Sequence, residues 1–309
     1  MSKLASISSQ PHVREYAQGA AQSATSAVAE FLSPTVGVAT STGRFKRYDE
    51  KHRFRIPDTR RALGGRATEL GFAATDATYN CAPNALDFPV DLLEQLESAD
   101  LENVYQEAAD IVSDVAALSH EKKVIDLAIS TVGGGTALDI GASDDVIDQL
   151  DANILSVIKA AKYGGLMGVG ILMGANAWRV VKNHKSVIDR FVAGGRKQFA
   201  NPSMTEFGQL LVTNAETRVS LMCFDDAAEG LPEDIEFVLD GDILVFARRE
   251  SPTRRDPSFM KTFRLRNQWM VPGSYTREDG RAEVAKFDWS EDVQVTNSAA
   301  AVRRTVVIS

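Results

Sequence analysis

The segment Arg44–Arg66, RFKRYDEKHRFRIPDTRRALGGR, decides how the rest of the chain is interpreted. Nine of its residues are Lys or Arg and three are acidic, so its net charge is +6 in a chain whose net charge is −8. Between Lys51 and Ile56 basic side chains alternate with aromatic and apolar ones, which is the period of a β-strand with one charged face. Pro57 and then Gly64–Gly65 supply a strand end and a turn. The segment therefore predicts a long, strongly basic, two-stranded hairpin.

The sequence that follows carries the opposite charge. No proline or glycine interrupts Asp91–Ile129, and apolar residues recur there at spacings of three and four, which predicts a long helix from Asp91 to at least Ser119. Ten acids and two bases lie between Asp91 and Asp126, a net charge of −8. An isolated hairpin is marginally stable in water, so the basic hairpin needs an acidic surface to lie on.

The opposite charges of the hairpin and the helix have two interpretations. The helix either has an acidic face in contact with solvent, or it receives the basic hairpin of another subunit, since a projecting hairpin points away from its own root. Each exposed ion pair contributes about 0–1 kcal/mol, so such pairs act by their number and set register and orientation. The residues predicted to make this inter-subunit contact are Lys51, Arg53, Arg55, Arg60, Arg61 and Arg66 on the hairpin, and Glu94, Glu97, Glu102 and Glu107 on the helix.

The remaining segments predict two further lobes and an arm. Residues 1–42 lack a sustained apolar period, and their composition predicts disorder except for a short helical face at Val28, Phe31 and Leu32. Residues 81–89 look like a turn-rich connection, and the glycines at 133–135 mark a boundary. A compact α/β lobe is expected beyond them. Its helices are predicted at 144–161, at 174–191 as one helix or two, and at 204–211. Its strands are predicted at 168–173, 218–224, 235–239 and 243–247.

The C-terminal part predicts long antiparallel strands. Apolar side chains alternate with polar ones along 261–271, with Asn267 as the exception, and along 285–295. This indicates two eleven-residue strands joined across 272–280. A strand at 301–308 is a candidate to close their sheet. With the long helix across it, this sheet forms a lobe of the α+β class.

Composition sets limits on the class of protein. Hydrophobic residues make up 44% of the chain and charged residues 25%, as in ordinary soluble globular proteins. The first forty residues contain no apolar core of the length of a secretory signal, and the most apolar run, 164–175, is too short to cross a bilayer. Cys81 and Cys223 lack metal-ligand spacing, so we expect free thiols in a reducing compartment, with Cys223 in a buried strand.

The order of these parts resembles the major capsid proteins of tailed bacteriophages. RFKRYDEKHRFRIPDTRRALGG at 44–65 is similar to the extended loop of one branch of that family, with Tyr79 as its following aromatic residue. ILMGANAWRVVKNHKSVIDRF at 171–191 is similar to an axial-domain segment, and DPSFMKTFRLRNQ with YTREDGRAEVAKFDWSEDVQVTNSAA is similar to the C-terminal hairpin. The resemblance covers roughly residues 40–300.

The resemblance implies a fold, a set of domains and a function. The fold is α+β, with a long spine helix on an antiparallel sheet, a compact axial domain, an extended β-hairpin loop and an N-terminal arm. The function is that of a non-enzymatic virion protein, assembled in the host cytoplasm, whose pentamers and hexamers form an icosahedral head around double-stranded DNA. The implied domains are 1–42 as the arm, 43–86 as the loop, 87–132 as the spine helix and start of the peripheral domain, 133–247 as the axial domain, and 248–309 as the peripheral strands and C-terminus.

The implied partners are other copies of the chain, a portal, a decoration protein in some relatives, and packaged DNA bound without sequence specificity; no membrane partner is implied. Some relatives begin with a long scaffolding segment, whereas the arm here is short, which favours a separate scaffolding protein. Within the same fold, an encapsulin-like storage shell or the capsid of a gene-transfer particle is the alternative.

Two other classes of protein are weighed from the residues alone. A nucleic-acid-binding protein is supported by the arginines and aromatic residues of the hairpin and opposed by the overall acidity. A metalloenzyme would need Asp144, Asp145 and Asp148 as ligands with His184, but acids at the start of a helix have a simpler explanation in the helix dipole. The sequence provides no catalytic set, and we expect no cofactor and no metal.

Overall fold

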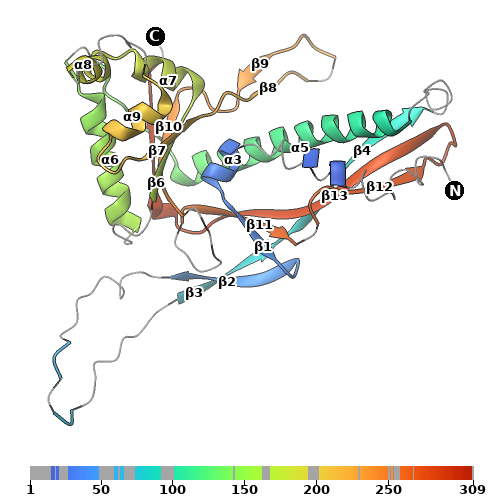
Figure 1. The fold of residues 1–309 in the computed structure, drawn as a ribbon, viewed down its shortest axis with the longest axis horizontal. Coiled ribbons are helices and arrows are strands. Elements are labelled where there is room, and N and C mark those ends of the chain that lie inside the picture. The colour runs from blue at the N-terminus through green and yellow to red at the C-terminus, as the bar shows by residue number, and fades with distance from the viewer. Residues whose placement is uncertain are drawn as a thin grey trace. The chain divides into compact units, whose positions relative to one another are not determined.

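The computed structural model describes residues 15–17, 19–20, 27–48, 59–61, 63–65, 74–91, 101–141, 143–161, 168–193, 202–228, 230–249, 251, 253, 258–266 and 268–307. The chain divides into two compact units, each assembled from segments that are distant in sequence (Figure 1). None of the described helices is both long enough and apolar enough to cross a membrane. The first unit holds residues 1–43, 79–126 and 262–294, and the second holds 44–78, 127–261 and 295–309.

The first unit is organised around one long strand, β13 (Ala282–Val295). With fourteen residues at about 3.4 Å each, it extends over about 48 Å. It pairs antiparallel with β4 (Ala82–Asp91) and with β12 (Val271–Thr276). Next to β13 lies β11 (Met260–Leu265), whose other edge pairs parallel with β1 (Thr35–Val38). The result is the predicted antiparallel sheet with one parallel edge strand.

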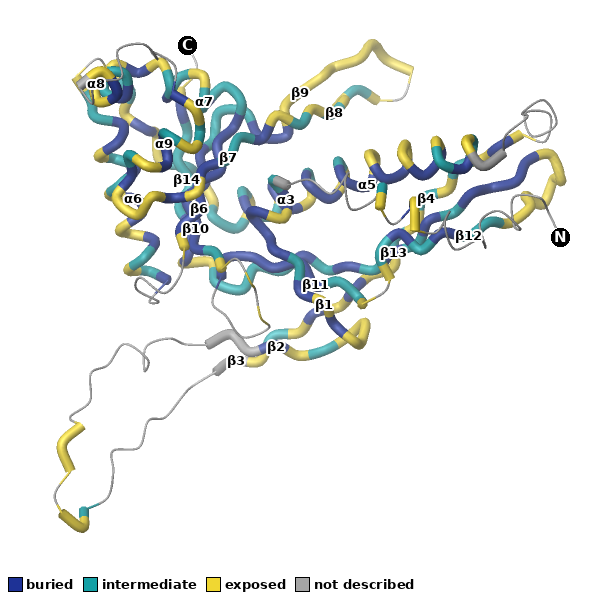
Figure 2. Tube along the Cα trace, viewed as in Figure 1, coloured by how far each residue is buried: buried dark blue, intermediate teal, exposed yellow. Residues whose placement is uncertain are grey.

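Helix α5 (Leu101–Val132) packs on this sheet over the part that belongs to the first unit. Its buried face is rich in alanine, which lets the helix approach the aromatic side chains of β13 closely. The ring centroids of Tyr105 and Phe287 lie 5.9 Å apart, and both side chains are fully buried. Figure 2 shows the helix buried along one side and exposed along the other. The core comprises Tyr105, Ala108, Ala109, Val112, Ala116, Met270, Ala285, Phe287 and Trp289, together with Ala17.

Two predicted boundaries of this unit are wrong. Residues 81–89 are mostly strand β4 rather than a turn-rich connection, and Val90–Asp91 end that strand rather than begin the helix. Prolines at 83 and 89 obscured the strand, but among the described strands β4 pairs with β13 alone, and an edge strand tolerates residues without an N–H. Helix α5 continues to Val132, where Gly133 follows with φ +76°, a conformation common just past helix ends.

The predicted eleven-residue strand 261–271 is also wrong. Strand β11 ends at Leu265, Met270 adopts φ +46°, and the chain then re-enters the same sheet as β12. The connection between β12 and β13 is therefore shorter than predicted, and Pro272 lies inside β12 opposite Phe287. The apolar alternation continues across this break, so the pattern alone conceals it.

Part of the predicted N-terminal arm belongs to the first unit. Helix α3 (Ala27–Leu32) buries Phe31 and Leu32, as the helical face predicted. The hydroxyls of Ser33 and Thr262 lie 2.9 Å apart, and β1 then pairs with β11. Disorder is therefore the wrong prediction for residues 33–38.

The second unit is a mixed sheet with helices. Its strand order is β5 (Thr136–Ala137), β14 (Ala301–Thr305), β10 (Asp242–Arg248), β6 (Gly168–Met173) and β7 (Glu216–Val219). The described helices are α6 (Val146–Ala161), α7 (Ala175–Lys182), α8 (Lys185–Ala193) and α9 (Met204–Leu210), with a short 3-10 helix at Ser298–Ala300. Central strands β6 and β10 carry fully buried side chains at Ile171, Leu172, Leu244, Val245 and Phe246.

Two expectations for this part change. The strand predicted at 218–224 is two strands, β7 and β8 (Cys223–Asp225), and Cys223 is exposed rather than buried. β8 forms a two-stranded hairpin with β9 (Ile235–Phe237). The C-terminal strand β14 pairs antiparallel with β10, so it joins the sheet of the second unit and does not close the sheet of long strands.

Candidate assembly interface

The basic segment begins in a two-stranded ribbon. Strands β2 (Thr42–Tyr48) and β3 (Ala74–Asn80) pair with each other, and the remainder of the predicted hairpin lies between them in sequence (Figure 1). Arg44 and Asp76 approach to 4.0 Å across the ribbon with both side chains largely exposed. Exposed pairs of this kind stabilise by about 0–1 kcal/mol, so this one does little to fix the ribbon.

The root of the ribbon is anchored by Tyr79. This side chain is 1% exposed and stacks on Phe263 with ring centroids 4.8 Å apart. Its hydroxyl lies 3.2 Å from the Thr40 hydroxyl, and a Cβ added at Gly43 would overlap the phenol. The Cys81 thiol is buried and donates to the Phe263 carbonyl. The ribbon therefore has a closely packed base.

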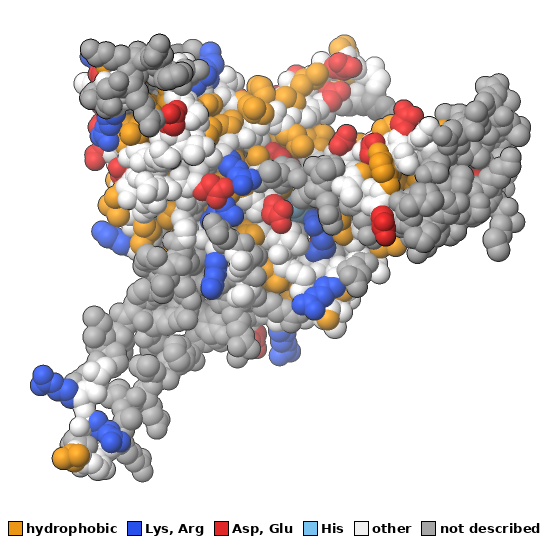
Figure 3. Space-filling model, viewed as in Figure 1, with side chains coloured by type: hydrophobic (Ala, Val, Ile, Leu, Met, Phe, Trp, Pro, Cys, Tyr) orange, Lys and Arg blue, Asp and Glu red, His pale blue; other side chains and the backbone are white. Residues whose placement is uncertain are grey.

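Three of the ten predicted contact side chains can be placed. Arg60 and Arg61 are exposed, and Figure 3 shows basic side chains at this described part of the segment. Glu107 is exposed on α5. Glu102 lies in α5, but its side chain, like all of Lys51, Arg53, Arg55, Arg66, Glu94 and Glu97, falls outside what the structure describes. Exposure is what an inter-subunit contact requires, and the contact itself stays a prediction.

The acidic face of α5 also carries apolar side chains. Ile111 is 43% exposed and Val115 is 49% exposed, next to Asp110 and Asp114. The Tyr16 hydroxyl donates to Asp110 over 2.9 Å, which contributes to a raised pKa of the phenol. Burial of these aliphatic groups against a partner would add to the stability of a contact made on this face.

A buried charged cluster was missed by sequence reasoning. Glu291 on β13 is 3% exposed and accepts from His120 Nδ1 at 2.9 Å and from Arg264 Nη2 at 3.0 Å. The Arg264 guanidinium lies 3.5 Å from the centroid of the Trp269 ring. Burial works to raise the pKa of Glu291, but His120 and Arg264 outweigh it and lower the pKa to about 2. The cluster ties helix α5 to β13 and β11.

One sequence signal could have revealed this cluster. Every second side chain of a strand lies on the same face, so Glu291 shares a face of β13 with Trp289 and Val293. It is therefore an acid on the apolar face of this strand. A buried carboxylate requires a partner, and a search for buried partners would have led to His120.

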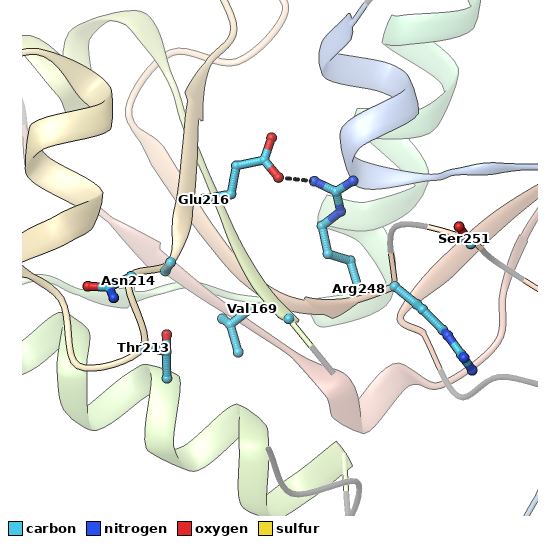
Figure 4. Close-up of a pocket in the computed structure, with 9 residues that line it drawn as sticks. Val169, Thr213, Asn214, Glu216, Arg248 and Ser251 are labelled. Atoms are coloured by element: carbon cyan, nitrogen blue, oxygen red, sulfur yellow. Dashed lines mark hydrogen bonds and ion pairs between the residues drawn. The ribbon is translucent and has the colours of Figure 1, made fainter. Parts of the chain in front are cut away.

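The second unit contains a polar hollow of about 470 Å³ (Figure 4). Glu216, on edge strand β7, pairs with Arg248 at the end of β10, and β6 lies between these two strands. The ion pair crosses β6 where Gly168 pairs with Arg248 and Gly170 with Glu216, residues that place no side chain in its path. The pair joins three strands at their ends, and the hollow shows no nucleophile paired with a base among its lining residues.

The acids and histidine weighed as metal ligands have structural partners. Asp145 accepts hydrogen bonds from backbone amides in the first turn of α6 and pairs with Arg190. His184 Nε2 lies 3.1 Å from the Gly141 carbonyl. In the part of the chain that the structure describes, no group of three or more His, Cys, Asp or Glu is arranged to hold a metal ion. The acids therefore begin a helix, as the simpler interpretation stated.

Comparison with known proteins places this fold. No protein-family model and no curated protein sequence matches the chain. A phage-related protein from Bordetella bronchiseptica RB50 superposes with a TM-score of 0.69 at 15% identity, over 96% of each chain. The capsid of cyanophage P-SCSP1u superposes with a TM-score of 0.54 at 11% identity, over 90% of this chain and 87% of that one. The chain has the fold of phage capsid proteins.

A virus-like particle from Pyrococcus furiosus also shares the fold, with a TM-score of 0.52 at 11% identity over 95% of this chain and 97% of that one. The α+β class and the tailed-phage capsid fold expected from the sequence are confirmed. At these identities the shared property is the fold, so the function is argued separately.

Proposed function

We propose that the chain is the structural subunit of a bacteriophage head. Copies associate as pentamers and hexamers into an icosahedral shell that encloses double-stranded DNA. The observation that carries this proposal is the superposition of almost the whole chain on a phage-related protein and on phage capsid structures. A match over both units is specific, because a shared sheet or helix pair would cover only part of each chain.

The exposed features support self-association. The ribbon of β2 and β3 has a closely packed root, and the described arginines between these two strands are exposed. An extension of this kind gains stability when it lies on another molecule. Many weak contacts per subunit, repeated around a closed shell, act together as a multivalent interaction. We propose that the basic segment lies on the acidic face of α5 in a neighbouring subunit.

The two units correspond to domains in this proposal. The first unit, with α5 and β13, is the peripheral domain and holds most of the spine helix. The second unit contains the axial domain, and residues 43–86 hold the extended loop. The C-terminal residues 295–309 group with the second unit, which supports assigning them to the axial domain rather than to the peripheral strands.

The proposed partners follow from a structural role. They are other copies of the chain, a separate scaffolding protein, a portal, a decoration protein and packaged DNA. Assembly takes place in the host cytoplasm and the product is a virion capsid. Such a subunit needs no cofactor and catalyses no reaction.

The test is electron microscopy and size-exclusion chromatography of the full chain, alone and with a candidate scaffolding protein. Closed shells, tubes or capsomer-sized rings are expected without any added DNA. A monodisperse monomer under all conditions contradicts the proposal, and if that monomer also binds DNA the nucleic-acid-binding alternative takes its place. Analysis of shells isolated from the native source distinguishes a head filled with DNA from a storage shell filled with protein.

A further inference from the structure

The hairpin formed by β8 and β9 exposes apolar side chains to solvent. Its strands have three residues each, and their register places Cys223 opposite Phe237 and Asp225 opposite Ile235. Leu221, Leu231 and Ile235 are 65–68% exposed, and Phe237 is 40% exposed. A two-stranded hairpin is marginal alone in water, so a hairpin that exposes so much aliphatic surface gains from a partner.

The same hairpin is acidic. Residues 221–239 contain six acids and no Lys or Arg. Asp225 accepts from the backbone amides of Ala227 and Asp234, so it holds the local turn. Glu233, Asp234 and Glu236 have no ion pair with any residue that the structure describes. Figure 3 shows acidic and hydrophobic side chains together on this hairpin.

The second unit also carries a basic surface at the junction of α7 and α8. Arg179 and Lys182 lie in the last turn of α7, and Lys185 begins α8. Arg179 and Lys185 are exposed and Lys182 is half-buried. No described acid forms an ion pair with these three side chains, whereas Arg190 on the same helix pair is occupied by Asp145. We call Arg179, Lys182 and Lys185 the basic junction.

We propose that the β8–β9 hairpin of one copy docks on the basic junction of a second copy. The carboxylates of Glu233, Asp234 and Glu236 face the basic junction, while Leu231 and Ile235 lose contact with water. This inference rests on the proposed function as a shell subunit and names one of its contacts. In Figure 1 the hairpin projects away from α8 of its own unit, which favours a contact between copies.

The contact joins two different surfaces of the same chain. Such a head-to-tail interface generates a ring when the rotation between neighbours closes. Complementary charge also disfavours the hairpin-to-hairpin arrangement, because like charges would then meet. The docking therefore sets the direction in which subunits follow one another around a ring.

A different role for the acids has to be separated from this one. Charged side chains on an exposed strand edge also prevent uncontrolled pairing between strands. If that is their only role, reversing the charges of the basic junction has no effect on association.

The experiment reverses each surface in the full chain. The hairpin variant is Glu233→Lys, Asp234→Lys and Glu236→Lys, and the junction variant is Arg179→Glu, Lys182→Glu and Lys185→Glu. A combined variant carries all six changes, so its charges are complementary again. Asp225 is left unchanged because it holds the turn. Circular dichroism and thermal melting confirm that each variant folds, and sedimentation velocity measures the fraction assembled.

We expect each triple variant to weaken association by about tenfold and the combined variant to recover most of the loss. A matched control reverses three exposed acids elsewhere, Glu30→Lys, Asp148→Lys and Glu278→Lys, which changes the net charge as much as the hairpin variant does. This control is expected to assemble normally. Its normal assembly separates a local contact from a general effect of net charge.

Cross-linking supplies a direct readout. A carbodiimide joins a lysine to a carboxylate only when the two touch, so wild-type chains labelled with ¹⁵N are mixed with unlabelled chains before treatment. Mass spectrometry should find cross-links between differently labelled chains that join Lys182 or Lys185 to Glu233, Asp234 or Glu236.

The outcomes are distinct. If wild-type protein forms shells and both triple variants do so equally well, the docking is wrong and the proposed function stands. If the triple variants fail but the combined variant does not recover and no such cross-link forms, the docking is also wrong. A wild-type protein that stays monomeric under every condition overturns both the docking and the shell function.

Discussion

At the scale of single residues, the charged cluster of Glu291, His120 and Arg264 is the most consequential feature. Two charge-assisted hydrogen bonds hold the carboxylate in a site where isolated charges are strongly disfavoured. The low pKa of Glu291 means that the folded state binds its proton less readily than the unfolded chain does. The stability of the first unit therefore depends on pH through this residue.

The first prediction concerns acid stability. Because the pKa of Glu291 falls from 4.5 to about 2 on folding, its contribution of about 3 kcal/mol is fully present above pH 4.5 and is lost as the pH falls toward 2. Urea unfolding between pH 7 and pH 3 measures this loss. In Glu291→Gln, which leaves the guanidinium of Arg264 without its counter-charge, we expect a loss of about 3–5 kcal/mol at pH 7.

The control for that prediction is Asp288→Asn. Asp288 also lies on β13, but it is 44% exposed and pairs with Lys286 at 3.3 Å. Its substitution should change stability by less than about 1 kcal/mol. Equal stability of Glu291→Gln and the wild type at pH 7 would show that the cluster is not coupled to folding.

The second prediction concerns the root of the basic segment. In Gly43→Ala the new methyl group overlaps the ring of Tyr79, which is buried against Phe263 and cannot move without disturbing it. We expect a loss of about 1–3 kcal/mol in the free energy of unfolding, measured with urea. Gly134→Ala is the control, because a Cβ there meets nothing within 4 Å. Similar values for the two variants would contradict the anchoring role of Tyr79.

At the scale of elements, the basic segment and α5 are the pair that the charge pattern singles out. Arg60 and Arg61 of the segment and Glu107 of α5 are exposed, and the segment begins in β2, which pairs with β3. Folding of the subunit does not require the segment's charge, because its core lies elsewhere. Changes in the segment should therefore separate assembly from folding.

The third prediction tests this separation. Reversal of Arg53, Arg55, Arg60 and Arg61 to Glu should leave a folded subunit that assembles poorly, because the segment then repels an acidic neighbour. Circular dichroism measures folding, and particle yield by electron microscopy measures assembly. A control reverses four other exposed bases, Lys123, Lys159, Arg277 and Arg281. Normal particle yield from the first variant would refute the placement of the segment on a neighbour.

At the scale of the whole molecule, some exposed surfaces of the chain are basic and others are acidic. Interactions between exposed charges are screened over about 10 Å at 0.1 M salt and about 3 Å at 1 M. A shell stabilised by many such contacts should depend on ionic strength more strongly than the subunit does.

The fourth prediction follows from this screening. Raising the salt concentration from about 0.1 M to about 1 M should slow assembly and reduce the assembled fraction, while the urea midpoint of the free subunit changes little. Light scattering follows assembly over time. Assembly that proceeds equally fast at both salt concentrations would show that apolar contacts, rather than the opposed charges, drive association.

Local pattern and charge in the sequence determined several parts of this protein. The spacing of apolar residues predicted most of α5 and α6, and the two-residue alternation predicted most of β13, because period 3.6 and period 2 are properties of a single element. The sequence also predicted the buried strand β6 and the opposite charges of the basic segment and α5. From the predicted contact set, Arg60, Arg61 and Glu107 are exposed as an interface requires.

Only the tertiary structure decided the features that depend on pairing between distant segments. Strand β4 contains prolines that local rules assign to turns, and its pairing with β13 overrides them. The interruption between β11 and β12 at Met270 and the sheet that β14 joins both depend on which strand edges are available for pairing. These edges exist only once the sheets have assembled. The Glu291 cluster joins residues separated by up to 171 positions. Sequence periodicity reports only which face of an element is buried, and the fold decides what that face meets.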